Sequence, residues 1–486
     1  MENPVRWILA ITVWLSVSVG LAAEQTISLD DATHEQCLAI LWMGVNSEEF
    51  WPAMHAAEGL TQAGCPDEAR KALSPRLPVE VDDQRRCGLA RELVRAGDLT
   101  HTQIMLDILA GENSYGHTHA AESLYKVWQI GDGVVLRRAL ARFDHPKTGL
   151  MAAAALARWG NPVALNVLRA HVSDADGETA KVAAWILARI GDASDIPKLR
   201  EGATRFSEPL TKAYFEHALA CLGDKEGRTA LLLNLKHPDT AVRTYACEFA
   251  PEARVVEAKD SLIALLKDTG LDVRIRAAQA LLVLAKSPGP DRREGFAREI
   301  FKATKKNPRY SEGSVVGLRD GRLLYATTEL TEVDSDLTNK RIVAAISCDD
   351  GRSWSQPQEL QRMMDLEADS ASWTPAPDWQ VKVPMPESTV YVIPSTGDWL
   401  LVGNSKNDSK LNPGGPATTL STAISNDQGR TWSRPRQIES NPKSAYGDAS
   451  VFFHQGRILL TYPVRDEKTG RISSRFRSLP IGDLYQ

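Results

Sequence analysis

The sequence predicts a multidomain α + β protein in which an array of helical repeats is followed by an all-β segment. In the first part, alanine-rich helical patterns recur about every 31 residues. After residue 288 they are replaced by short alternating apolar runs, separated by Gly, Asp, Asn and Pro. At 486 residues the chain is also too long for one hydrophobic core, which favours more than one domain.

The N-terminus has the pattern of a secretory signal peptide. Arg6 precedes the apolar run Trp7–Leu21, and the small residues Ala22 and Ala23 follow it. We expect residues 1–23 to be this peptide, with cleavage near Ala22 or Ala23 and a secreted or periplasmic mature protein. An uncleaved signal anchor is the alternative interpretation.

Composition excludes several classes of function. Hydrophobic residues make up 43% of the chain and charged residues 24%, as in ordinary soluble proteins. A net charge of −5 argues against a nucleic-acid or membrane-surface role, because both need a basic surface. No Walker A loop, G-x-G-x-x-G, H-E-x-x-H, G-x-S-x-G or EF-hand motif is present, so we expect no cofactor and no metal. The six cysteines show no metal-ligand spacing; they are either disulfide partners or, as we favour, buried thiols.

The repeat array is expected to span residues 30–288. Each alanine-rich pattern ends in a glycine, and successive glycines lie 29 to 34 residues apart; they are Gly64, Gly97, Gly131, Gly160, Gly191 and Gly223. A glycine just past a helix adopts the left-handed conformation that ends it, and a following Asp or Asn can cap the next helix. One helix pair cannot bury its apolar face alone, so the pairs are expected to stack into an α-solenoid.

These repeats resemble the HEAT family in a short-period form. The supporting residues are Asp239 with Arg243, and Asp272 with Arg274, at the starts of two inner helices. The resemblance implies a protein-interaction array whose concave surface binds a protein partner.

The C-terminal part is expected to comprise a linker at residues 289–300 and a β segment at 301–486. It contains two octapeptides of the form S-x-D-x-G-x-x-W, namely SCDDGRSW and SNDQGRTW. The aspartates suit hydrogen bonds to their own turn, the glycines a positive φ, and the tryptophans packing between strands. The positions are Ser347, Asp349, Gly351 and Trp354 in the first copy, and Ser425, Asp427, Gly429 and Trp432 in the second.

The octapeptides resemble the Asp box of sialidase-type β-propellers. The flanking segments Asn307–Ala326 and Ser444–Pro480 are similar to the opening strand and the closing blade of the bacterial members. The resemblance implies a partial all-β propeller of sialidase type, incomplete at about three blades. We expect both boxes on its periphery and an exposed strand edge where the ring of blades is open.

The resemblance also implies chemistry. Sialidases are retaining exo-α-sialidases that use a tyrosine nucleophile, an aspartic acid as proton donor, a glutamate beside the tyrosine and arginines that bind the substrate carboxylate. The candidates are Tyr446 as nucleophile, Asp336 as acid, Arg309 as a clamp residue and Glu312 as a pocket carboxylate. The region expected to supply the glutamate beside the tyrosine is missing from the segment. The implied partners are glycans that contain sialic acid or a related sugar. Arg309, Asp336 and Tyr446 are expected at one mouth of the β segment.

Each candidate also has a structural interpretation. Tyr446 suits a core or edge position, Asp336 an exposed acidic loop, and Glu312 a turn. No arginine lies between Arg362 and Arg430, where a further clamp residue is expected. Besides an exported sialidase-like glycoside hydrolase, the sequence therefore permits a non-catalytic glycan-binding or scaffolding protein with a degenerate propeller. A third possibility is an incomplete chain whose full-length relative is the enzyme.

Overall fold

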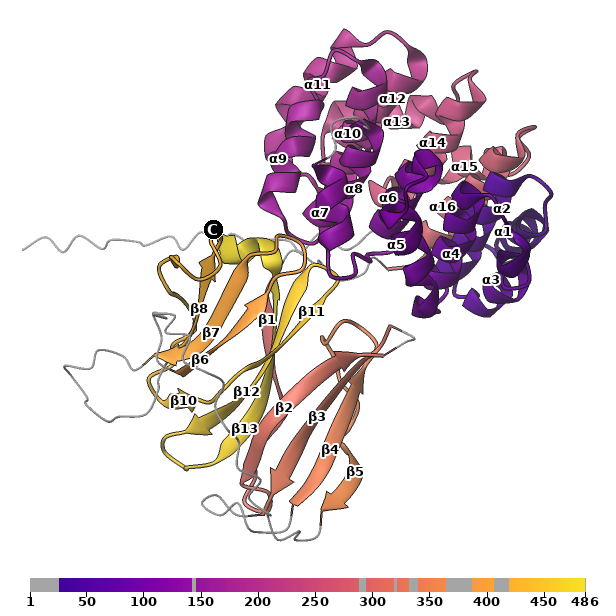
Figure 1. The fold of residues 1–486 in the computed structure, drawn as a ribbon. Helices are drawn as coiled ribbons and strands as arrows, with labels where there is room; N and C mark the ends of the chain where they lie inside the picture. The colour runs from indigo at the N-terminus through magenta and orange to yellow at the C-terminus, as the bar shows by residue number, and fades with distance from the viewer. Residues whose placement is uncertain are drawn as a thin grey trace, which may run out of the picture.

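In the computed structural model the chain forms a helical part and a sheet-rich part (Figure 1). The structure describes residues 26–141, 146–287, 294–318, 321–331, 340–363, 387–405 and 419–485. The predicted signal peptide therefore lies outside the described residues. Among the described helices, none combines the length and the apolar character that a membrane span requires.

The helical part comprises sixteen α-helices within the described residues up to 287, joined by tight turns and short 3₁₀ segments. Outer and inner helices alternate along the chain. The outer helices are α1 (Asp31–Val45), α3 (Pro66–Leu73), α5 (Thr102–Ala110), α7 (Val134–Leu140), α9 (Pro162–His171), α11 (Ile196–Arg205), α13 (Lys225–Asn234) and α15 (Lys259–Leu265). The inner helices are α2 (Phe50–Ala63), α4 (Asp83–Arg95), α6 (His117–Lys126), α8 (Pro146–Arg158), α10 (Gly177–Ile190), α12 (Pro209–Cys221), α14 (Thr240–Glu252) and α16 (Leu271–Leu284).

The helix ends follow the predicted chemistry with one exception. Asp224 accepts a hydrogen bond from the Gly227 amide at 2.8 Å, and Asn161 caps α9 in the same way. Five of the six repeat glycines have positive φ, for example 86° at Gly223. Gly191 is extended instead, with φ −75° and ψ −179°, so the left-handed conformation predicted there is wrong. A capping box at Asp192 starts the next segment directly from this extended residue.

The inner helices form a closed ring. Each packs against the next in order, and α16 packs against both α1 and α2, which brings the last repeat against the first. Two glycines permit this approach. A Cβ atom at Gly44 would lie 2.8 Å from Ile275 Cδ1, and one at Gly59 would lie 3.4 Å from Gln279 Cβ, and both of these residues belong to α16. The sequence predicted a stack of repeats but not its closure.

Within the described residues the sheet-rich part contains a nine-stranded sheet and a four-stranded sheet. A single parallel pair divides the nine-stranded sheet, so the strands fall into three antiparallel groups. The first is β2 (Arg309–Gly317), β3 (Leu323–Leu330), β4 (Lys340–Ser347) and β5 (Gln358–Met363). The second is β6 (Glu387–Val392), β7 (Trp399–Ser405), β8 (Thr419–Ser425) and β9 (Arg436–Glu439). The third is β11 (Ser450–His454), β12 (Arg457–Asp466), β13 (Ile472–Pro480) and β1 (Phe296–Phe301), and the short β10 (Ser444–Tyr446) also pairs with β12.

The three groups of strands are not joined into a closed structure. β13 and β2 share a single parallel pair, Ile472 with Arg309, and β5 lies at one end of the strand path. Within the described residues the strands close into neither a barrel nor a propeller, so the sheet-rich class is established but the propeller type is not. Strand β1 begins at Phe296, inside the segment predicted as a linker, and pairs with the C-terminal strand β13.

The two parts are joined through a common core. One hydrophobic cluster includes Leu156 and Leu168 of the ring together with Ile458, Leu460 and Ile481 of the sheet region. At the junction the Asn161 side-chain amide donates to the Ser395 carbonyl at 2.7 Å. All six cysteines are free thiols, as we favoured from the sequence, but only Cys37, Cys87 and Cys247 are buried. Cys65 and Cys221 are partly exposed and Cys348 is exposed, so the prediction of buried thiols is wrong for these three.

Candidate functional site

Tyr446, the predicted nucleophile, lies at the end of β10 and is 3% exposed. Its hydroxyl accepts a hydrogen bond from the Asn441 amide at 3.2 Å. The ring packs edge-on against Tyr462, with 6.2 Å between the ring centroids. Burial raises the pKa of Tyr446 despite the Asn441 hydrogen bond, and the nearby Glu439 carboxylate raises it further. Burial and a raised pKa both favour the structural interpretation of this tyrosine over the catalytic one.

Glu439, at the end of β9, is the centre of the polar cluster beside Tyr446. One of its carboxylate oxygens accepts a hydrogen bond from the Tyr462 hydroxyl at 2.5 Å, and from Arg475 and Arg477 at 3.1 and 3.0 Å. Burial opposes ionisation of Glu439, but these three donors hold its pKa below the usual value. The cluster therefore links the second group of strands to β12 and β13, and both arginines are already paired with a carboxylate.

Arg309, the predicted clamp residue, begins β2 and pairs with Leu330 on one side and Ile472 on the other. Tyr446 pairs with Val464 of β12. Arg309 and Tyr446 therefore lie at the same end of the sheet, and β12 and β13 lie between their strands. At about 4.8 Å per strand, their backbones lie roughly 14 Å apart.

The other two predicted catalytic residues are not placed in a site. Glu312 falls where the register of β2 with β3 shifts between Tyr310 and Gly313. Asp336 lies outside the described residues. The predicted meeting of Arg309, Asp336 and Tyr446 therefore stays a prediction.

The two octapeptides form closely matching turns. In each, the serine hydroxyl accepts from the glycine amide, and the aspartate accepts from the amide four residues after it. The first turn has Gly351 to Ser347 at 2.8 Å and Ser353 to Asp349 at 2.8 Å; the second has Gly429 to Ser425 at 2.7 Å and Thr431 to Asp427 at 2.8 Å. The φ angles of the glycines are 87° and 83°. The turn geometry predicted from the sequence is confirmed in both copies.

The tryptophans of the two turns differ in their partners. Trp354 donates from Nε1 to the Gly351 carbonyl at 2.8 Å and packs against Tyr325 and Phe476. Trp432 Nε1 is buried without a hydrogen-bond partner in the described part of the chain, and its ring lines a cavity of about 940 Å³ against α9 and η6 (Ile481–Tyr485). The first turn is thus self-contained, whereas the second faces the helical ring.

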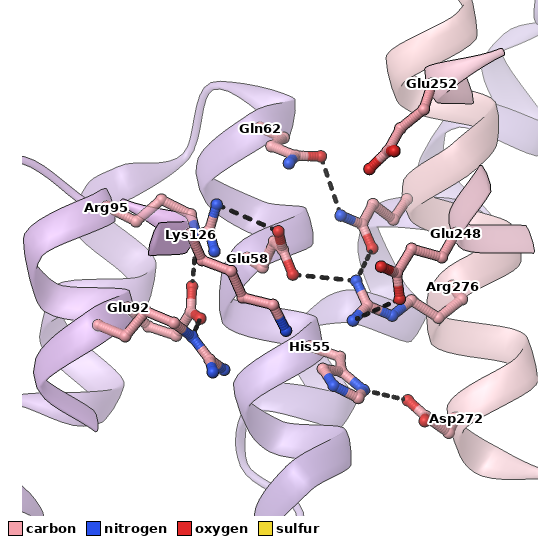
Figure 2. A network of polar contacts seen from close by, with 12 residues as sticks. His55, Glu58, Gln62, Glu92, Arg95, Lys126, Glu248, Glu252, Asp272 and Arg276 are labelled. Carbon is pink, nitrogen blue, oxygen red and sulfur yellow. Dashed lines mark hydrogen bonds and ion pairs between the residues drawn. The ribbon is translucent and has the colours of Figure 1, made fainter. Parts of the chain in front are cut away.

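A second polar cluster lies at the centre of the helical ring (Figure 2). Glu58 pairs with Arg95 at 3.1 Å and with Arg276 at 3.0 Å. Glu248 pairs with Arg276 at 3.4 Å and with Arg189 at 2.6 Å. These pairs connect α2, α4, α10, α14 and α16 across the interior of the ring.

The same network joins the two ends of the array, as Figure 2 shows. His55 contacts Asp272 at 2.7 Å, and the Gln279 amide donates to the Gln62 side-chain oxygen at 2.9 Å. Together with the Glu58–Arg276 pair, these contacts repeat at three- and four-residue intervals along α2 and α16. This spacing places them on one face of each helix, so the ring is closed by a ladder of polar contacts.

Burial and charge act on the carboxylates of this network in different ways. Burial opposes ionisation of Glu58, but Arg95 and Arg276 hold its pKa well below the usual value. Glu252 is also buried and lies 2.7 Å from Arg189, yet burial dominates and raises its pKa. The interior therefore holds a carboxylate whose pKa is lowered, Glu58, beside one whose pKa is raised, Glu252.

Three cavities are lined at least in part by residues of the helical ring. The ring cavity, of about 420 Å³, is lined by inner-helix residues that include Glu58, Arg158 and Arg276. The junction cavity, of about 830 Å³, lies between the ring and the segments 455–457 and 480–483 of the sheet region. The third is the cavity beside Trp432. Among the described residues, no group of three His, Cys, Asp or Glu residues is arranged to hold a metal ion.

The sequence prediction missed both polar clusters. In the sheet region a usable signal was the alternation of Arg475 and Arg477, which puts both on one face of a strand. In the ring the signal was the recurrence of ionisable residues late in successive inner helices, as at Arg95, Lys126 and Arg158. Neither signal identifies the distant partner residues.

Comparison with known proteins supports the helical part only. A family model described as HEAT repeats matches residues 134–220, from α7 to α12. Comparison with curated proteins gives no match. Among solved structures, human deoxyhypusine hydroxylase in complex with glycerol is 16% identical, with a TM-score of 0.29, over 52% of this chain and 97% of that one. An engineered protein is 18% identical with a TM-score of 0.18 over the same shares.

These comparisons limit what is carried over to this chain. Similarity at such TM-scores carries no argument about function. HEAT repeats form surfaces for protein partners, which is the one functional implication of the match.

Proposed function

We propose that this protein is a non-catalytic scaffold, in which the helical ring and the sheet region act as one body that binds a protein partner. The observation that carries the proposal is the pairing of Arg475 and Arg477 with Glu439 beside the buried Tyr446. Carboxylate capture by a sialidase needs unpaired arginines, and nucleophilic attack needs an accessible tyrosine. Export through the predicted signal peptide is part of the proposal.

The common core supports the idea of one body. Apolar side chains of ring and sheet pack in a single cluster, and close backbone contacts surround Gly160 and Gly456. A Cβ atom at Gly160 would lie 2.6 Å from the Gly482 nitrogen. Such contacts favour a rigid connection over a flexible tether. The HEAT-repeat match supports a protein as the partner.

A sialidase-like glycoside hydrolase is the second candidate, and the matching octapeptide turns are the observation that favours it. Under this proposal the three groups of strands are blades, both turns are Asp boxes, and Tyr446 is activated by Glu439 in the presence of a glycan. Arg309, Asp336 and Glu312 would complete the site. A non-catalytic glycan-binding function rests on the same turns.

Hydrolysis of a fluorogenic sialoside by the intact mature chain decides between the candidates. The scaffold proposal predicts no product release above that of a Tyr446→Phe variant. Tyr391→Phe is the matched control, because Tyr391 donates to the Ala449 carbonyl elsewhere in the sheet region. Turnover that is lost in Tyr446→Phe and retained in Tyr391→Phe would establish the hydrolase and overturn the scaffold proposal.

A further inference from the structure

The ring cavity is built from seven of the eight inner helices. Side chains of α2, α4, α6, α8, α10, α14 and α16 line it. Its volume of about 420 Å³ falls within the range of small-molecule sites in proteins. A closed ring of helices holds such side chains in fixed positions, which is what a specific site requires.

The lining of the ring cavity is basic although the chain as a whole is acidic. Seven lining residues are basic and three are acidic, in a protein of net charge −5. The basic residues are Arg95, Lys126, Arg158, Arg189, Arg254, Arg276 and Lys286, and the acidic ones are Glu58, Glu248 and Glu252. The cavity therefore attracts anions.

Arg158 differs from the other arginines of the network because no carboxylate in the described part of the chain pairs with it. Its guanidinium stacks on the Trp128 and Tyr125 rings, at 4.0 and 4.8 Å from their centroids, and one nitrogen donates to the Tyr125 carbonyl at 2.8 Å. Burial lowers the pKa of Arg158 to about 10, as expected for a cation without a counter-ion.

Four donors around the ring cavity are buried with no hydrogen-bond partner among the described residues. They are Arg158 Nε, Arg95 Nη2, Arg276 Nε and the Tyr125 hydroxyl. Tyr125 is 1% exposed and Arg276 is 2% exposed. Buried donors are normally satisfied, because an unsatisfied one forfeits its hydration without compensation. Arginine nitrogens donate only, so the missing partner is an acceptor.

We infer that the ring cavity binds a small organic oxyanion, a molecule with a carboxylate or phosphate group that pairs with the Arg158 guanidinium and accepts from the Tyr125 hydroxyl. The planar guanidinium matches the geometry of both oxyanions. Lys126 and Arg189, which lie over the adjacent Trp185 ring, add further positive charge to the cavity. This site goes beyond the scaffold function and is independent of any chemistry at Tyr446.

The ring cavity lies beside the junction of the two parts. Arg158, Arg189 and Glu252 line both the ring cavity and the junction cavity, so the two cavities share this wall. Gln455, Gly456 and Arg457 of the sheet region lie on the opposite side of the junction cavity. The ring cavity is therefore next to the contact between the ring and the sheet region.

Titration calorimetry of the intact chain tests the inference, with inorganic phosphate and citrate as separate probes at matched ionic strength. We expect saturable binding of at least one probe and at least tenfold weaker binding in Arg158→Gln. Binding of phosphate alone identifies a phosphate-bearing ligand, and binding of citrate alone identifies a carboxylate. Arg138→Gln is the matched control, because Arg138 is exposed on the outer helix α7. This control should bind as the unmodified chain does.

A second variant keeps the test decisive if Arg158→Gln fails to fold, as judged by circular dichroism. Tyr125→Phe keeps the ring stack with Arg158 and removes one hydroxyl, so binding should weaken about three- to tenfold. Absence of saturable binding by either probe into the millimolar range would overturn the inference. Equal binding by folded Arg158→Gln and the unmodified chain would do the same.

Discussion

The two polar clusters of this protein contain the same residue types but differ in whether their hydrogen-bond donors have partners. In the sheet region, Tyr462, Arg475 and Arg477 all donate to a single oxygen of Glu439. In the ring, Arg158, Arg276 and Tyr125 keep buried donors that no described residue satisfies. A cluster whose donors converge on its own carboxylate links strands, whereas one with donors left over is suited to a ligand.

The largest effect is expected from breaking the cluster in the sheet region. Glu439→Gln leaves Arg475 and Arg477 without their counter-ion in a half-buried setting, which should lower the free energy of unfolding by about 3 kcal/mol. Urea denaturation measures the change. The exposed Glu467→Gln is the control, with an expected change below about 0.5 kcal/mol. A loss below about 1 kcal/mol in Glu439→Gln would mean that the cluster is not a structural link.

Closure of the ring can be tested at Gly44. A Cβ there would lie 2.8 Å from Ile275 Cδ1 and 2.9 Å from Ala56 Cβ, so Gly44→Val should cost about 2 to 3 kcal/mol by overpacking. Thermal or urea unfolding provides the measurement. Gly111→Ala, whose added Cβ would meet only carbonyl oxygens at 3.4 Å, should be nearly neutral. Similar stability of both variants would contradict the contact between the first and last repeats.

The ring should also be the acid-sensitive part. His217 is fully buried beside Phe249, accepts from Asn234, and has its pKa lowered to about 3 by burial. The unfolded state binds the proton more readily, so stability is lost as pH falls below about 6.5. Acidification from pH 7 to 5 should cost about 2 kcal/mol through this residue.

The variant His217→Gln isolates this contribution. Its stability should depend less on pH over the same interval in urea titrations, whereas the exposed His34→Gln should keep the full dependence. If the stability of His217→Gln depends on pH as strongly as that of the unmodified chain, the proton taken up on unfolding binds to another residue.

The smallest effect is expected at the junction. Asn161→Ser keeps a capping oxygen for α9 but removes the bond to the Ser395 carbonyl, with an expected loss of about 1 kcal/mol. Differential scanning calorimetry should still show one transition, because the core is common to both parts. Two separate transitions in the unmodified chain would contradict the description of one body.

The sequence was informative where the determinants are local. The period of the helices and the turns at Ser347 and Ser425 depend on residues within a few positions of each other, and both are found in the structure. Closure of the ring depends on the small rotation from each repeat to the next, summed over eight repeats. No single repeat encodes that sum.

The site was hard to predict because its contacts are remote. Glu58 meets Arg276 across 218 positions, and Glu439 meets Arg477 across 38. Tyr446 was singled out from its neighbours in sequence, which gave no indication that Asn441 and Tyr462 bury it. Pattern identifies residue types on a face, but pairing requires the three-dimensional fold.

A crystal structure of the intact chain, with crystals soaked separately in phosphate and in citrate, compares the two clusters most directly. Our account predicts an oxyanion beside Arg158 Nε and the Tyr125 hydroxyl, with the hydrogen bonds of Glu439 unchanged. Density for the oxyanion beside Tyr446, with Arg475 or Arg477 turned away from Glu439, would contradict it. A ring cavity that holds only water would contradict it as well.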